Sequence, residues 1–134
     1  MANALYNSFK ARLLSPGVDL SAVTVKAALI DTGADAFNAA DDFFDDVSAG
    51  VVGTPQTIGS KTFTNGVFDG ADVTFTAVSG ATAEAILLYV DTGTPATSYL
   101  IGFLDTGVTN LPVTPNGGDI AIAWDNGSSK IFAI

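Results

Sequence analysis

Few side chains in this sequence belong to the types that usually perform chemistry. The chain has no histidine and no cysteine, a single glutamate, Glu84, and five basic residues. Enzymes and metal sites draw mostly on imidazole, thiolate or carboxylates of raised pKa. Acid–base work would therefore fall to aspartate, whose ordinary pKa is too low for a base poised at neutral pH. The composition favours a structural or binding protein over an enzyme, and predicts no catalytic residue, cofactor or metal.

One motif argues for an enzyme. The segment Ala28-Leu29-Ile30-Asp31-Thr32-Gly33-Ala34-Asp35 resembles the active-site strand of retroviral-type aspartic proteases. In that family two such loops, one from each subunit of a homodimer, bring together two aspartates that share a proton. The resemblance implies that Asp31 would be the catalytic residue. Further along, Leu100-Ile101-Gly102 loosely resembles the family's segment beneath the catalytic loop.

The same triplet also has a simpler interpretation. Asp-Thr-Gly recurs at residues 91–93 and 105–107, each time after an apolar strand. In a strand-ending turn, Asp and Thr bond the local backbone and Gly takes a positive φ. Three copies in one chain favour a turn, and a homodimeric protease remains the enzyme hypothesis.

An acidic stretch follows the first copy. Six aspartates lie between residues 31 and 46. A calcium loop needs carboxylates in the register Asp-x-Asp-x-Asp-Gly with a distal Glu, and that register is absent. We interpret the stretch as a solvated acidic loop, with a weak cation site as the alternative.

The first element that can position these groups is a helix predicted at residues 3–14. Leu5, Phe9 and Leu13 follow a helical spacing, and Tyr6 and Leu14 widen the stripe. Pro16-Gly17 ends it. The stripe packs either on its own domain or, as an arm, on a neighbouring subunit.

The remainder reads as β-structure. A short helix capped by Asn38 and carrying Phe43 and Phe44 interrupts it, and Asn65-Gly66 predicts a hairpin turn. About eight strands are expected, at residues 23–30, 61–64, 67–69, 73–77, 85–90, 99–104, 120–124 and 130–134, together with an extended segment at 51–58 that Pro55 interrupts. We therefore predict a mainly β chain: a single β-sandwich or jelly-roll-like body at 17–134 after an N-terminal helix or arm at 1–16.

Charge narrows the possible partners. The net charge of −9, and four lysines and one arginine scattered along the chain, argue against binding to nucleic acid and to anionic lipid. The first residues do not have the pattern of a secretory leader, and no apolar run is long enough for a membrane span. We expect a protein made and folded in a cytoplasm.

A second resemblance extends over nearly the whole chain. It is carried by Met1-Ala2-Asn3-Ala4-Leu5-Tyr6-Asn7, Val25-Lys26-Ala27-Ala28-Leu29-Ile30-Asp31-Thr32, Thr64-Asn65-Gly66-Val67-Phe68-Asp69, Asp72-Val73-Thr74-Phe75-Thr76, Ala83-Glu84-Ala85-Ile86-Leu87-Leu88-Tyr89, Leu111-Pro112-Val113-Thr114-Pro115-Asn116-Gly117-Gly118-Asp119-Ile120 and Trp124-Asp125-Asn126-Gly127. With these segments the chain resembles small virion structural proteins of tailed bacteriophages. The resemblance implies a capsid decoration (cement) protein on the outer head surface, with the major capsid protein as partner. A tail or fibre component of the same virion is the alternative.

Such a protein needs a docking surface and contacts between its own copies. Because several apolar strands are expected to need cover on both faces, we predict a homotrimer. The candidate partner contacts are Leu5, Tyr6 and Phe9 on the predicted helix and Phe43 and Phe44 in the acidic stretch.

Overall fold

The computed structural model describes residues 3–15 and 17–134, and the described chain is mainly β. Its main sheet has five antiparallel strands in the order β1-β7-β6-β2-β3. Their bounds are β1 (Ala4–Leu5), β7 (Leu100–Leu104), β6 (Ala85–Asp91), β2 (Thr24–Ile30) and β3 (Val51–Thr57). The centre is the long pairing of β2 with β6, which runs without interruption from Thr24 opposite Asp91 to Ile30 opposite Ala85.

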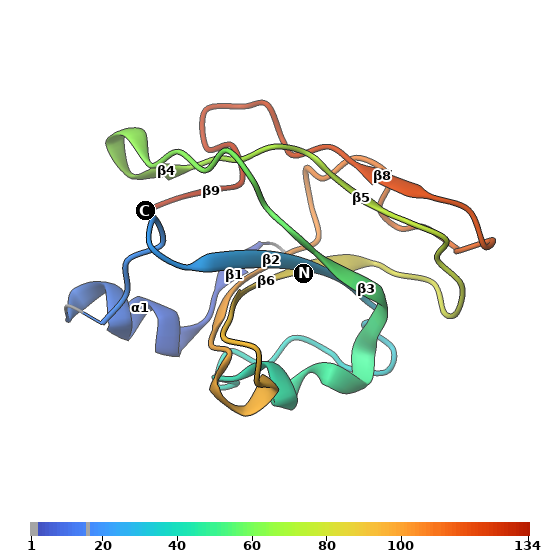
Figure 1. Ribbon diagram of the computed structural model, residues 1–134, viewed down its shortest axis with the longest axis horizontal. Coiled ribbons are helices and arrows are strands. Elements are labelled where there is room, and N and C mark those ends of the chain that lie inside the picture. Colours follow the sequence, from blue (N-terminus) through green and yellow to red (C-terminus); the bar gives the residue numbers. More distant parts are fainter. Residues whose placement is uncertain (1–2, 16) are drawn as a thin grey trace.

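Two short antiparallel ribbons lie over one face of this sheet (Figure 1). One pairs β4 (Val67–Phe68) with β9 (Phe132–Ala133), and the other pairs β5 (Val73–Phe75) with β8 (Ile120–Ile122). The opposite side carries three 3-10 turns, η1 (Phe44–Asp46), η2 (Ser48–Gly50) and η4 (Pro95–Thr97), while helix α1 (Asn7–Leu14) packs at one end of the molecule. A fourth 3-10 turn, η3 (Thr64–Gly66), precedes β4.

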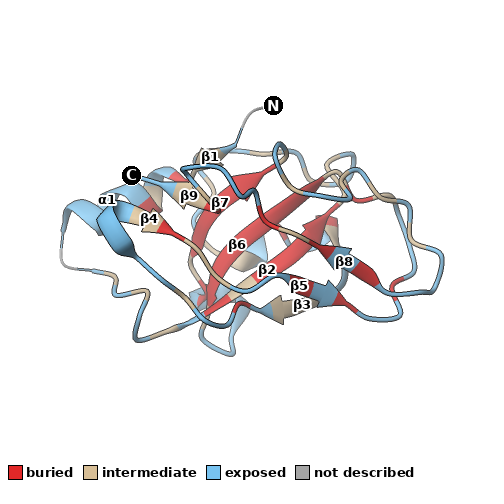
Figure 2. Cartoon of the chain, turned by 90° about the horizontal axis from the view of Figure 1, so that it is seen from above, coloured by how far each residue is buried: buried red, intermediate tan, exposed pale blue. Residues whose placement is uncertain are grey.

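The two continuous apolar runs form the strands β6 and β7, whose two faces are both covered by other parts of the chain. Every residue of β7 is buried, as is every residue of β6 before Asp91 (Figure 2). Burying each Leu, Ile, Val or Phe side chain among them contributes about 1.5–3 kcal/mol. Since one subunit already covers these strands, they do not require a second subunit, and that argument for a homotrimer no longer applies.

The N-terminal segment departs from the predicted helix at 3–14. Ala4 and Leu5 are extended and pair with Phe103 and Gly102 at the edge of the main sheet, and the helix begins only at Asn7. The Tyr6 N–H continues this pairing by donating to the Ile101 carbonyl at 3.1 Å. A free sheet edge satisfies backbone groups that the first turn of a helix would leave unpaired. Pro16, the predicted helix terminator, lies outside the described residues, as do Met1 and Ala2.

The predicted helix after Asn38 is also absent from the described structure. Asn38 accepts the Ala40 N–H, and Asp46 accepts the N–H groups of Asp42 and Phe43, so the chain forms turns η1 and η2 instead. Short polar side chains compete with helical bonding in this way.

The Asn65-Gly66 turn forms as predicted, with positive φ at both residues, but its strands are shorter than expected. A single bridge joins Thr62 to Asp69, and β4 takes β9 as its ladder partner. None of the helices among the described residues is both long and apolar enough to cross a membrane.

Candidate functional site: an apolar groove at one end

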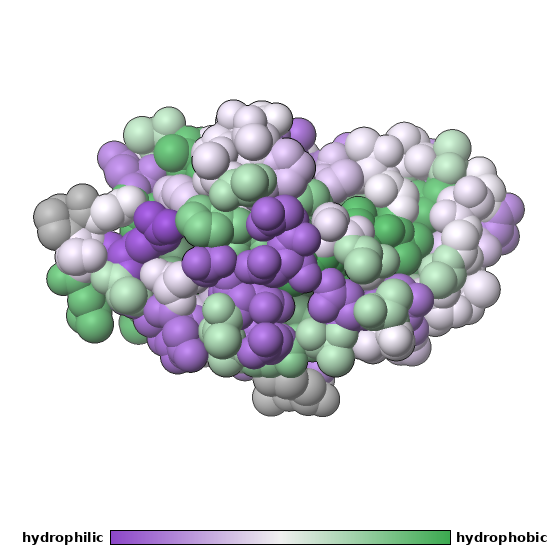
Figure 3. Space-filling model, turned by 90° about the horizontal axis from the view of Figure 1, so that it is seen from below, coloured by the Kyte–Doolittle hydropathy of each residue, from purple (hydrophilic) through white to green (hydrophobic). Residues whose placement is uncertain are grey.

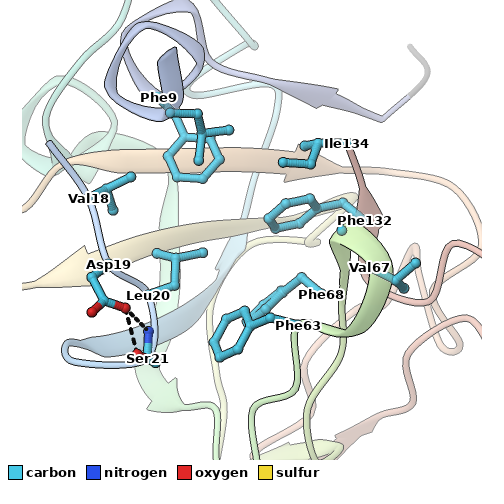
Figure 4. Close-up of a pocket in the computed structure, with 12 residues that line it drawn as sticks. Phe9, Val18, Asp19, Leu20, Ser21, Phe63, Val67, Phe68, Phe132 and Ile134 are labelled. Carbon is cyan, nitrogen blue, oxygen red and sulfur yellow. Dashed lines mark hydrogen bonds between the residues drawn. The ribbon is translucent and has the colours of Figure 1, made fainter. Parts of the chain in front are cut away.

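A groove of about 450 Å³ opens between α1, the segment that follows it, the turn before β4 and the end of β9 (Figure 4). Its lining is mostly apolar. The residues are Phe9, Leu13, Val18, Asp19, Leu20, Ser21, Phe63, Gly66, Val67, Phe68, Phe132 and Ile134.

A row of four aromatic rings forms the floor. Phe9 from α1 meets Phe132 edge-on at 6.0 Å between ring centroids, and Phe132 lies 5.1 Å from Phe68. Phe68 in turn lies 5.6 Å from Phe63. The ladder of β4 with β9 places Phe68 directly opposite Phe132, so strand register builds the centre of this row.

One wall is the chain between α1 and β2. The Asp19 carboxylate accepts from the N–H and hydroxyl of Ser21, which closes a local turn. These bonds hold the pKa of Asp19 below its usual range. The Lys61 ammonium donates to the Leu20 carbonyl at 2.7 Å and to the Val23 carbonyl. A lysine bound to backbone oxygens thus fixes the backbone at Leu20 and Val23 beside the groove.

The opposite wall depends on a close backbone approach. The Ile134 N–H donates to the Gly66 carbonyl at 3.0 Å. Gly66 has a φ of +76°, and a Cβ there would lie 3.2 Å from the Ile134 carbonyl oxygen. Glycine at 66 therefore satisfies both the turn and the packing of the chain end.

The exposed apolar side chains concentrate at this groove. Among the described residues, the large hydrophobic side chains that remain exposed are Leu13 (37%), Leu14 (92%), Phe63 (39%) and Ile134 (71%). Leu13, Phe63 and Ile134 line the groove, and Leu14 directly follows Leu13 in the chain. Asp19 is the one charged residue in the lining. Such a surface can bind apolar groups, and it presents no set of side chains suited to acid–base or nucleophilic chemistry.

Of the five predicted contact residues, only Phe9 lines this groove, and it lies at the bottom with no exposed surface. Tyr6 is also buried, with its ring 5.1 Å from Phe37, and burial raises its pKa. Leu5 is half-buried in β1, where its side chain contacts the position of Gly102. The structure therefore packs Leu5, Tyr6 and Phe9 on their own subunit, whereas Leu13 and Leu14, the last residues of the stripe, remain exposed.

Phe43 and Phe44 lie elsewhere. Phe44 stacks on Tyr89 at 4.1 Å between centroids, and its N–H donates to the Ser98 carbonyl. Phe43 is bridged to Tyr99, and the Arg12 guanidinium lies 4.4 Å from the Tyr99 ring. These half-buried rings join the acidic loop to β6, β7 and α1, and they do not come together with Leu5 or Phe9.

Asp31 stands in a turn. Its carboxylate accepts the Gly33 N–H at 2.9 Å, and Asp91 accepts the Gly93 N–H at the same distance. Thr32 does not bond the local backbone as expected. Its N–H and hydroxyl both donate to the carboxylate of Glu84, which is far away in the sequence, at 2.9 Å. This geometry supports the turn interpretation of the motif.

The acidic loop forms a hydrophilic face beneath the main sheet, visible at the centre of Figure 3. Desolvation and then the charge of Asp46 raise the pKa values of Asp35 and Asp41. The Asp46 carboxylate, which accepts the N–H groups of Asp42 and Phe43, has a lowered pKa. In the described part of the chain, no three carboxylates converge to hold a metal ion.

The sequence interpretation did not single out Phe63, Phe68, Phe132 or Ile134. The sequence did hold one indication that two of these rings lie close together, because Phe63 and Phe68 flank the predicted Asn65-Gly66 turn. Their convergence with Phe9 and the chain end depends on the pairing of β4 with β9, which no local pattern reveals.

Comparison with known proteins adds no assignment: no protein-family model matches the chain, and neither does any curated protein sequence.

Proposed function

We propose that this chain is a capsid decoration protein of a tailed bacteriophage, which binds the major capsid protein on the outer head surface and stabilises the head as a homotrimer. The sequence resemblance to small virion structural proteins supports this proposal, as does a residue repertoire poor in catalytic groups. Its location is then the virion, after synthesis in the host cytoplasm.

The observation that carries the proposal is that the exposed apolar side chains and the acidic side chains lie on different parts of the surface. Every large exposed apolar side chain of the described residues lies at or beside one groove, whereas the loop beneath the main sheet is strongly acidic. A protein attached to a particle needs one adhesive end and a soluble remainder. Weak contacts suffice when several linked subunits bind together.

We further propose that the fold is an open β-sandwich of the jelly-roll kind. The five-stranded sheet would be one layer, and the ribbons β4–β9 and β5–β8 would form the second. The strands of both ribbons are short, and short edge strands reduce edge-to-edge aggregation.

The test is localisation together with head stability. Virions of the phage that encodes the chain should show its density over the head in a cryo-electron microscopy reconstruction, at threefold positions. Heads that lack the protein should melt at a lower temperature, and adding back the purified chain should restore the melting temperature. Density confined to the tail or fibres would contradict the decoration role and favour the alternative virion location.

A further inference from the structure

We propose that Asn126 is a site of self-modification, at which the side-chain amide reacts with the backbone nitrogen of Gly127 and becomes aspartate or isoaspartate without an enzyme. The two residues lie in the loop between β8 and β9. The inference goes beyond the proposed function, because neither residue lines the apolar groove and the reaction can be followed in the purified chain.

The reaction is fastest where glycine follows asparagine, because a side chain on the following residue hinders ring closure. The chain has three Asn-Gly pairs, at residues 65–66, 116–117 and 126–127, and all three asparagines are exposed. Sequence and exposure therefore do not distinguish the three pairs. The hydrogen bonds around them do.

Two charged side chains contact the reacting groups at Asn126. The Asp125 carboxylate accepts the Gly127 N–H at 3.1 Å, so a base lies at the nitrogen that must lose its proton and attack. The Lys130 ammonium donates to Asn126 Oδ1 at 2.7 Å. Negative charge develops on that oxygen when the nitrogen adds to Cγ, and a cation at this distance stabilises it. The loop thus holds a base, an electrophile and an oxyanion stabiliser.

At Asn116 the corresponding contacts are uncharged. The Gly117 N–H donates to the Val78 carbonyl at 2.7 Å, and Asn116 Oδ1 accepts the Gly118 N–H at 3.0 Å. A carbonyl oxygen is too weak a base to take the proton of an amide, and a neutral N–H stabilises a developing oxyanion less than an ammonium does. This pair should therefore react slowly while the chain is folded.

At Asn65 the backbone is held in a turn. Asn65 has a φ of +55°, and the Gly66 N–H donates to the Phe63 carbonyl at 3.3 Å. The Gly66 carbonyl in turn accepts the Ile134 N–H. The Gly66 nitrogen must leave these bonds before it can attack, and the local opening adds a free-energy cost to the reaction.

The atoms balance with water as the co-reactant. The Gly127 nitrogen passes its proton to the Asp125 carboxylate and bonds to Asn126 Cγ. The bond from Cγ to Nδ2 breaks, and the side-chain nitrogen leaves with that proton as ammonia. Water then adds to either carbonyl group of the resulting succinimide and opens the ring. One opening gives aspartate, and the other gives isoaspartate, which has an additional methylene group in the main chain.

The product changes the charge of one region of the surface. Asn126 lines a hollow of about 490 Å³ together with Asp69, Asp72 and Asp125, so either product adds a further carboxylate to an acidic hollow. Because an amide becomes an acid, modified and unmodified chains should separate by anion exchange. A purified sample should therefore become heterogeneous in charge as it ages.

Peptide mapping by mass spectrometry tests the proposal on the folded wild type, incubated at physiological pH and temperature. The amide-to-acid mass gain should appear about tenfold faster at Asn126 than at Asn65 or Asn116. In the chain unfolded by urea the three rates should converge, because the distinguishing hydrogen bonds are lost. Equal rates in the folded chain, or the same preference for Asn126 in urea, would overturn the structural assignment.

A substitution at Lys130 tests the role of the ammonium. Lys130→Met should slow conversion of Asn126 by about tenfold, because a hydrogen bond to a charged group contributes enough free energy to change a rate by that factor. Lys10→Met is the matched control, since it removes the same charge from an exposed position in α1. It should convert like the wild type. An unchanged rate in Lys130→Met would exclude this lysine from the reaction.

The product ratio tests the ring closure itself. Wild-type chains should contain both isoaspartate and aspartate at position 126, and Gly127→Ala should suppress both. A Cβ at Gly127 would lie 3.4 Å from Asp125 Oδ2, which is ordinary contact, so this variant should fold. Aspartate without any isoaspartate would indicate direct hydrolysis of the amide and would overturn attack by the Gly127 nitrogen.

Discussion

The three Asp-Thr-Gly triplets follow three different strands, and their hydrogen bonds are alike in two copies and different in the third. Asp31 and Asp91 each accept the N–H of the glycine two residues later, whereas Asn3 receives the backbone N–H groups of Asp105 and Thr106. Gly93 and Gly107 have positive φ. One short motif therefore supports different turns, and its sequence alone does not define a catalytic loop.

Replacing Asp31 by Asn should have little effect. The amide oxygen can still accept the Gly33 N–H, so the free energy of unfolding should fall by at most ~1–2 kcal/mol, measured by urea denaturation. Head binding should be unchanged. Cleavage of peptides by the wild type at acidic pH, abolished by this substitution, would contradict the turn interpretation and establish the protease.

Two neighbouring glycines differ sharply in the space around them. A Cβ at Gly70 would lie 2.4 Å from Ile58 Cγ2 and 3.1 Å from the Gly59 carbonyl oxygen, whereas a Cβ at Gly59 meets nothing within 4 Å. Gly70→Ala should therefore cost about 1–3 kcal/mol through overpacking. Gly59→Ala should be neutral or stabilising by up to about 1 kcal/mol. Equal urea midpoints for the two variants would show that the backbone at Gly70 yields freely.

At the scale of elements, α1 is joined to its own subunit on two sides. Phe9 faces Phe132 of β9, and Arg12 lies over Tyr99 next to β7. Its preceding residues extend the main sheet as β1. Deleting residues 2–14 would remove all three attachments, so we expect an unfolded or aggregating product and not a folded body without its arm.

Single substitutions on a buried and on an exposed face of α1 test its attachment more mildly than the deletion does. Phe9→Ala should lower the free energy of unfolding by about 3–5 kcal/mol, because the ring is fully buried. Leu14→Ala should change it by less than about 0.5 kcal/mol, because that side chain is 92% exposed. Thermal melts by circular dichroism measure both. A tolerated Phe9→Ala would indicate that α1 is attached chiefly by backbone pairing.

The acidic loop should give the protein an unusual pH dependence. Asp35, Asp41 and Asp42 have raised pKa values in the folded state, so the folded chain binds their protons more tightly than the unfolded chain does. Their effect is a destabilisation at neutral pH that is relieved as the pH falls through the raised values toward 3.8. Asp46 and Asp91 have lowered pKa values, and the stability that they contribute is lost as the pH falls below 3.8.

The urea midpoint should therefore rise as the pH is lowered from 7 toward about 4, and fall at still lower pH. Asp41→Asn should reduce the rise, because its amide does not titrate and still accepts from Asn38. A midpoint that falls steadily from pH 7 downward in the wild type would show that repulsion in this loop does not limit stability.

At the scale of the whole molecule, stability should be graded from the main sheet outward. The β2–β6 pairing has seven register pairs, whereas β4–β9 has two and β5–β8 has three. Amide hydrogen exchange by mass spectrometry should show the strongest protection in β6 and in the β2 residues paired with it, and earlier exchange in both ribbons. Uniform protection would indicate that the ribbons and the sheet open as one cooperative unit.

Local patterns in the sequence were enough to predict the β-rich class and the positions of the longest strands. Residues 85–90 and 100–104 are continuous apolar runs that a mainly β chain can place only in the interior, and they became β6 and β7. The Asn65-Gly66 turn also formed, because positive φ is tolerated best by Asn and Gly. In these places the physical cause is contained in a few adjacent residues.

Tertiary structure decided the features that depend on distant partners. Ala4 and Leu5 are extended because the edge of β7 offers them backbone bonds, and residues 38–50 form turns because Asp46 binds the N–H groups ahead of it. The groove exists only because β9 pairs with β4 and brings Phe132 between Phe9 and Phe68. The composition determined that the surface would be acidic and poor in catalytic groups. Long-range strand pairing determined where its remaining apolar side chains meet.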